Sequence, residues 1–124
     1  MGYIMKTLNE ISKMVHELAI EKGWYDKKET DDEFVERTCN NLHDEVSELH
    51  TAWRENNLHN LCDKAQKMVE EGMNPLTYCE EELADIIIRA MDSAERLGVD
   101  IENAVLTKHR FNKTRPIRHG GKRS

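Results

Sequence analysis

The sequence predicts an all-α protein, and three observations carry that prediction. Apolar residues recur in alternating steps of three and four along most of the 124 residues, a spacing that only a helix places on one face. Capping residues precede these stretches and Gly or Pro follows them. No stretch alternates apolar with polar side chains, as half-buried strands do. We expect one domain over residues 1–116, a four-to-five-helix bundle completed by oligomerisation, and a basic, mobile tail over residues 117–124.

Two amphipathic helices are expected in the first half of the chain. The first ends before Gly23 and presents one apolar stripe: Ile4, Leu8, Ile11, Val15 and Leu18. Thr30 and Glu33 form the sequence pattern of a capping box, which indicates where the second helix begins. Its stripe runs until the Asn56-Asn57 break and consists of Val35, Cys39, Leu42, Val46, Leu49 and Trp53.

Three further helices are expected in the second half. A shorter amphipathic helix starts at Leu58 and ends before Gly72, and the role of the whole segment 56–76 stays open. Thr77 and Glu80 form another capping-box pattern. The helix after it carries an apolar stripe up to Gly98, made of Leu83, Ile87, Ala90, Ala94 and Leu97. Asp100 is the expected cap of a last helix over residues 101–115, which Pro116 ends.

The helix after Thr77 is apolar over more of its surface than a small monomer can cover. At about 100° per residue, its apolar side chains span an arc of about 200°. They are Leu83, Ala84, Ile86, Ile87, Ile88 and Met91, and they leave Glu82, Asp85, Arg89 and Asp92 on the remainder. We therefore expect a homodimer or a dimer-of-dimers tetramer.

Composition excludes several classes of protein. The longest apolar runs are three residues, such as Ile86 to Ile88, too short for a membrane span or a signal peptide. The three cysteines lie far apart and fit neither a disulfide framework nor a zinc knuckle. A net charge of -6 argues against non-specific nucleic-acid binding. We expect a cytoplasmic protein with no membrane or nucleic-acid partner. The end of the chain is nevertheless basic, because residues 108–124 contain seven Lys or Arg and no acid.

Two acidic pairs are the strongest candidates for chemistry. Glu45 and Glu48 are three residues apart on one predicted helix, and Glu82 and Asp85 are three apart on another. Each pair projects side by side, with about 5–6 Å between Cβ atoms. Four such acids between two packed helices would repel one another and become partly neutral through raised pKa values, whereas a hard divalent cation would hold them ionised. We expect Mg²⁺, with Mn²⁺ as a substitute, although some acidic pairs of this spacing arise by chance in an acidic chain.

The last predicted helix supplies a cationic complement. Lys108, Asn112 and Arg115 follow one another at steps of four and three, which places them on one face. An ammonium, an amide and a guanidinium in line can bind several phosphate oxygens, the guanidinium through two hydrogen bonds. The other interpretation of these three residues is a solvated surface strip.

The stretches 42–49, 82–85 and 108–122 together resemble the MazG-type nucleoside triphosphate pyrophosphohydrolases. This all-α superfamily, which includes dimeric dUTPases, shares an E-x-x-E and then an E-x-x-D motif on successive helices that bind Mg²⁺. The resemblance implies hydrolysis of (deoxy)nucleoside triphosphates to monophosphate and pyrophosphate, in control of the nucleotide pool. It also implies that Glu45, Glu48, Glu82 and Asp85 are the metal-binding catalytic residues and that Lys108, Asn112 and Arg115 contact the triphosphate.

Two other functions fit parts of the sequence. His43 and Asp44, with His16 upstream and Asp92 downstream, could supply the ligands of an HD-type metal phosphohydrolase, which is also all-α. A non-enzymatic helical interaction module would use the basic tail to bind an acidic partner and would leave the carboxylates as solvated helix faces.

Overall fold

The computed structural model of the chain describes residues 5–116, and within them it is built from five helices. They are α1 (Leu8–Glu21), α2 (Asp31–Arg54), α3 (Ala65–Glu70), α4 (Tyr78–Arg96) and α5 (Ile101–Thr114). No strand occurs in this range, where Leu61 and Thr77 form an isolated bridge. The prediction of an all-α protein is confirmed. The predicted tail at 117–124 lies outside the described residues, as does Ile4.

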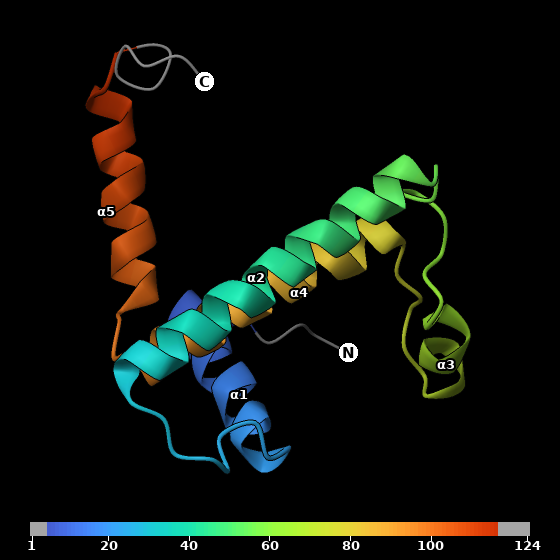
Figure 1. The fold of residues 1–124 in the computed structure, drawn as a ribbon. Helices are drawn as coiled ribbons and strands as arrows, with labels where there is room; N and C mark the ends of the chain where they lie inside the picture. Colours follow the sequence, from blue (N-terminus) through green and yellow to red (C-terminus); the bar gives the residue numbers. More distant parts are fainter. Residues whose placement is uncertain (1–4, 117–124) are drawn as a thin grey trace.

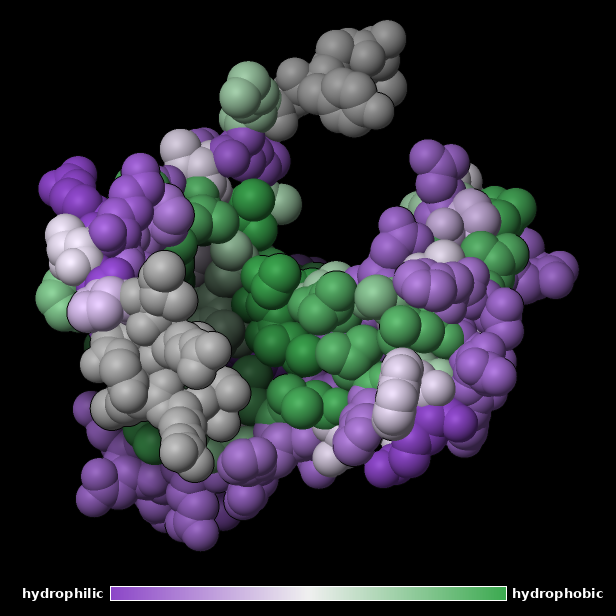
Figure 2. All heavy atoms as spheres, turned by 90° about the horizontal axis from the view of Figure 1, so that it is seen from above, coloured by the Kyte–Doolittle hydropathy of each residue, from purple (hydrophilic) through white to green (hydrophobic). Residues whose placement is uncertain are grey.

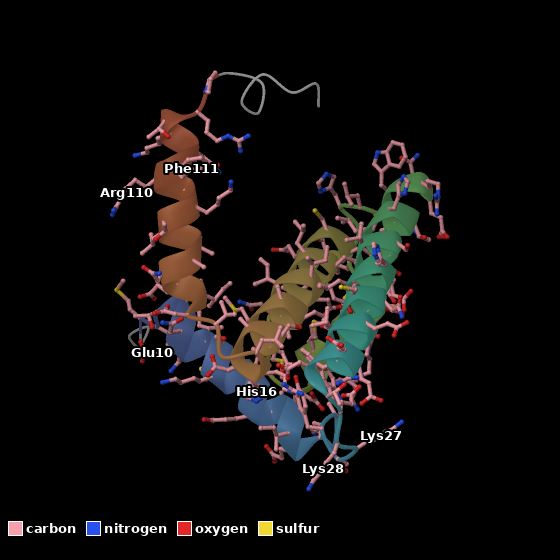
Figure 3. All side chains as sticks on the ribbon, turned by 60° about the vertical axis from the view of Figure 1, so that its left-hand side comes forward. Glu10, His16, Lys27, Lys28, Arg110 and Phe111 are labelled. Atoms are coloured by element: carbon pink, nitrogen blue, oxygen red, sulfur yellow. The ribbon has the colours of Figure 1, made fainter. Side chains whose placement is uncertain are left out.

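Helix α4 is the centre of the fold. It runs antiparallel to α2 along most of its length, and α1 packs across α4 near the end where α2 begins (Figure 1). His16 of α1 lies at this crossing (Figure 3). Helix α5 contacts α1 and then extends away from the α2–α4 pair, while α3 lies at the opposite end of that pair (Figure 1).

The helix starts follow from local capping. Both predicted capping boxes are present: Thr30 caps α2 with Glu33, and Thr77 caps α4 with Glu80. Thr7 forms a third box that starts α1. In each box the Thr hydroxyl and the Glu carboxylate accept hydrogen bonds from two backbone N–H groups that would otherwise lack partners. Asp100 caps α5 as predicted, by accepting from the N–H of Asn103 at 3.0 Å.

The predicted helix from Leu58 is wrong over its first half. Residues 58–64 form turns, and the helix covers only Ala65–Glu70. The backbone of this segment pairs with the start of α4, since the N–H of Cys62 donates to the Leu76 carbonyl at 2.9 Å and the N–H of Tyr78 donates to the Asn60 carbonyl at 3.0 Å. These long-range bonds take the place of the bonds that a helix would form, and they hold the segment against α4.

The face of α2 that packs on α4 is not the predicted apolar stripe. Val46 is 51% exposed and Trp53 is 60% exposed. The buried residues come one position earlier in each turn, about 100° around the helix, and they are Phe34, Thr38, Glu45 and Ala52. Apart from Phe34 the buried residues are small or polar, and the large apolar residues Val46 and Trp53 are left on the outside.

Helix α4 shows the same inversion except at Met91 and Ala94, which are buried as expected. Leu83 and Ile87 are exposed, whereas Glu82 and Asp92, which we expected on the polar remainder, are buried. Burial of Asp92 is compensated by hydrogen bonds, because its two carboxylate oxygens lie 2.7 Å from the His16 ring and 2.7 Å from the Tyr25 hydroxyl. A buried carboxylate without such partners would cost stability.

Five apolar side chains of α2 and α4 lie outside the core, four of them exposed and Leu49 half-buried, and they are here called the apolar face: Val46, Leu49, Trp53, Leu83 and Ile87. Its first four members, with neighbouring residues, line a shallow cavity of about 410 Å³. Figure 2 shows a broad hydrophobic area across the middle of the molecule, over these two helices. None of the described helices is both long and apolar enough to cross a membrane.

Candidate metal centre

The structure brings the four predicted carboxylates together. Each of Glu45, Glu48, Glu82 and Asp85 offers an oxygen, and these oxygens all lie within 4.8 Å of one another. This follows from the antiparallel packing of α2 and α4, which sets one i,i+3 pair opposite the other. Glu45 and Glu82 are buried, Asp85 is half-buried and Glu48 is exposed. The cluster therefore reaches solvent on the side of Glu48.

Two carboxylate oxygens in this cluster are buried without a hydrogen-bond partner, Oε2 of Glu45 and Oε2 of Glu82. The other oxygen of Glu45 accepts from Nε of Arg89 at 3.3 Å. One guanidinium cannot neutralise four carboxylates, and buried unpaired oxygens are costly. A donor set of carboxylate oxygens alone suits a hard cation such as Mg²⁺, so the residues present fit the expected ion.

The raised pKa values of three carboxyl groups in the cluster also fit a site for a cation. Burial raises the pKa of Glu82 from 4.5 to about 7, and a hydrogen bond to Glu48 together with the nearby negative charges adds to the shift. Burial is also the main reason that the pKa values of Glu45 and Asp85 are raised. A bound dication would lower all three, because it favours the charged carboxylates.

Without a divalent cation, the folded protein is expected to lose stability as the pH rises from about 5 to about 8. The pKa of Glu82 is higher in the folded chain than its ordinary 4.5, so over this window the folded state binds more protons than the unfolded state, and stability falls with pH. Thermal unfolding in chelator would measure this. Glu82→Gln should flatten the pH dependence of Tm, and an unchanged slope in that variant would refute the assignment.

A cavity of about 330 Å³ adjoins the cluster. Glu48 and Glu82 form one part of its wall. Another part is formed by Asn57, Asp63 and Lys64, which belong to the segment 56–76. The complete lining is Glu48, Thr51, Ala52, Glu55, Asn57, Asp63, Lys64, Tyr78 and Glu82. A small polar ligand in this cavity would touch both the carboxylates and residues 57–64.

The predicted phosphate-binding residues lie elsewhere in the chain. Lys108, Asn112 and Arg115 do share one face of α5, and with Pro116 they line a separate cavity of about 400 Å³. None of the four carboxylates borders that cavity. Figure 3 shows α5, labelled at Arg110 and Phe111, standing apart from the α2–α4 pair. One copy of the chain therefore presents the two halves of the predicted site on separate surfaces.

Three residues near the cluster were not predicted. Arg89 lies four residues after Asp85, so its position on the same helix face could have been found from spacing alone. Its guanidinium also lies over the Trp24 ring, 4.8 Å from the ring centroid. Glu81 is buried and its Oε1 lies 2.5 Å from Nζ of Lys64. No sequence signal pointed to that pair, because it depends on the non-helical path of residues 58–64.

The residues of the HD-type alternative are not gathered into one site. His16 and Asp92 lie together, but His43 and Asp44 are both exposed on α2. Among the described residues, two groups of side chains could hold a metal, and neither contains any of these four. Comparison with known protein families, curated proteins and solved structures finds no match for this chain.

Proposed function

We propose that the protein hydrolyses nucleoside triphosphates to nucleoside monophosphate and pyrophosphate with Mg²⁺ as cofactor. The observation that carries this proposal is the convergence of four carboxylates, two of them with buried unpartnered oxygens, at the wall of an open cavity. The resemblance of the same residues to the MazG-type motifs favours this reaction among those that use magnesium. We further propose that it acts on the cytoplasmic nucleotide pool, without nucleic-acid or membrane partners.

The four carboxylates have different roles in the proposed hydrolysis. When bound, Mg²⁺ would offset the negative charge of the polyphosphate and lower the pKa of the attacking water. Glu45, Glu82 and Asp85 would hold the ion from the buried side, and Glu48 would hold it from the exposed side. Because Glu48 is exposed and lines the cavity, we also assign to it the acceptance of the proton from the water.

A second copy of the chain is part of the proposal. The apolar face leaves large side chains open to solvent in the single chain, with Trp53 60% exposed and Ile87 53% exposed. Burial of such residues drives stable association. We propose that this face is covered in a homodimer or a dimer of dimers.

The separation of α5 from the carboxylates gives the second copy a further role. Because Lys108, Asn112 and Arg115 do not border the carboxylate cavity of their own chain, we propose that they contact the triphosphate bound in the other copy. Cations there would stabilise the charge that develops on the leaving pyrophosphate. The complete site would then need residues from two chains.

The test is product analysis over a panel of ribo- and deoxynucleoside triphosphates, with Mg²⁺ and with chelator. We expect monophosphate and pyrophosphate in equal amounts with Mg²⁺, and no turnover with chelator. Diphosphate and phosphate as products would overturn the proposed reaction. No turnover of any nucleotide by folded, dimeric protein would favour the non-enzymatic interaction module.

A further inference from the structure

A second group of potential metal ligands lies beside the first but has a different chemistry. It consists of Cys62, Asp63 and Glu81, whose Sγ and carboxylate oxygens lie within 4.8 Å of one another. Cys62 is 4% exposed and Glu81 is 7% exposed, while Asp63 reaches the surface. None of the three is a member of the four-carboxylate cluster.

Glu81 supplies an independent indication that this group binds something. Its Oε2 is buried and has no hydrogen-bond partner. Its Oε1 already has a cationic partner, Nζ of Lys64 at 2.5 Å, and the same ammonium lies 3.4 Å from Oδ1 of Asp63. A buried carboxylate oxygen normally has a partner. One oxygen of Glu81 is thus not held by Lys64.

The backbone fixes the thiol in this position. The bridge between Leu61 and Thr77 and the bond from the Cys62 N–H to the Leu76 carbonyl, at 2.9 Å, tie residues 61–62 to the start of α4. Glu81 lies in the first turn of that helix. Cys62 and Asp63 also line a surface cavity of about 470 Å³, which gives an ion a path to the thiol.

We propose that Cys62, Asp63 and Glu81 form a binding site for Zn²⁺ or a similar transition-metal dication. A thiolate ligand selects such ions over Mg²⁺, which prefers oxygen. Three protein ligands leave a fourth position for water. The thiol proton is released to solvent when the metal binds. This site would tie residues 58–64 to α4, and it does not depend on the proposed pyrophosphohydrolase activity.

Lys64 would compete with the metal. Its ammonium occupies one oxygen of Glu81 and lies close to Asp63, so it repels a dication that approaches the same carboxylates. Lys64→Gln removes this charge without removing a ligand. We expect that variant to bind the metal more tightly than the wild type, by about tenfold or more.

Cobalt titration of the full chain tests the site, because Co²⁺ bound to a thiolate gives a near-ultraviolet charge-transfer band and Zn²⁺ has none. We expect the band in the wild type, its loss on addition of Zn²⁺, and its absence in Cys62→Ser. Cys79→Ser is the matched control and should keep it. Asp63→Asn changes an exposed ligand, avoids disturbing the core, and should weaken Co²⁺ binding at least about tenfold.

The outcomes separate this site from the carboxylate cluster. Glu48→Gln should retain the cobalt band even if it has no activity, because Glu48 is not a ligand here. A band that persists in Cys62→Ser would come from another thiol and would overturn the proposal. Absence of the band in both the wild type and Lys64→Gln, with both proteins folded by circular dichroism, would overturn it as well.

Discussion

Glu48→Gln is expected to lower kcat for nucleoside triphosphate hydrolysis by about 10²- to 10⁴-fold while the fold and the oligomer are unchanged. Loss of a general base typically has an effect of this size. Gln keeps the shape of the side chain but removes the charge that holds the metal and accepts the proton. Glu48 is exposed, so its replacement leaves no cavity or buried unpaired group, and the thermal stability should change little.

Glu55→Gln is the matched control for this variant. Glu55 lines the same cavity and is also exposed, but it is not one of the four clustered carboxylates. Its kcat should stay within about threefold of the wild type. Steady-state rates of pyrophosphate release would measure both variants. Equal rates in Glu48→Gln and Glu55→Gln would remove Glu48 from the mechanism.

Ile87→Asp is expected to separate the oligomer into monomers. Ile87 is 53% exposed in the single chain, so an Asp there would be solvated and harmless in a true monomer. In a dimer that covers the apolar face, the same carboxylate would be buried without a partner. The dissociation constant should rise at least about 100-fold, which corresponds to about 2.7 kcal/mol.

Multi-angle light scattering at micromolar concentration would measure this change, with Met73→Asp as the control. Met73 is 56% exposed and lies outside the apolar face, so its variant should keep the mass of the wild type. Under the proposed cross-chain site, monomeric Ile87→Asp should also be inactive. A monomeric wild type, or an unchanged mass for Ile87→Asp, would contradict the proposed interface.

The sequence predicted the positions of α2, α4 and α5 well because their signals are local, whereas the first helix starts at Leu8, after the capping box of Thr7, and not near Ile4. A capping box such as that of Thr30 and Glu33 satisfies backbone donors within one turn, whatever the rest of the chain does. The signal that ends a helix is also local. Asn56, just after α2, has a φ of 61°, a conformation that few residue types adopt. The first half of the predicted short helix was wrong because residues 58–64 bond to the start of α4, a contact distant in sequence.

The buried face of each helix could not be read from the same periodicity. The stripe containing Val46 and Trp53 is the most apolar face of α2, yet the face containing Thr38 and Ala52 packs against α4. A period of 3.6 residues shows that an apolar face exists, but it does not show whether the same chain or another copy covers it.

The candidate site was likewise predicted only in part. The i,i+3 spacing of each acidic pair is local, and antiparallel packing of α2 and α4 was enough to bring the pairs together. The separation of Lys108 and Arg115 from that cluster depends on the direction in which α5 leaves the bundle. The pairing of Lys64 with Glu81 depends on the irregular segment before α4. Neither has a signature in the sequence.

Titration with Mn²⁺, followed by electron paramagnetic resonance, is the most direct test of the claim that the four carboxylates form a divalent-cation site. Bound Mn²⁺ loses the sharp signal of the free ion, so binding can be counted without any substrate. We expect saturable binding to the wild type at neutral pH, competed by Mg²⁺ and weakened at least about tenfold in both Glu48→Gln and Glu82→Gln. Wild-type protein that leaves the free-ion signal intact, or variants that bind as the wild type does, would contradict the claim.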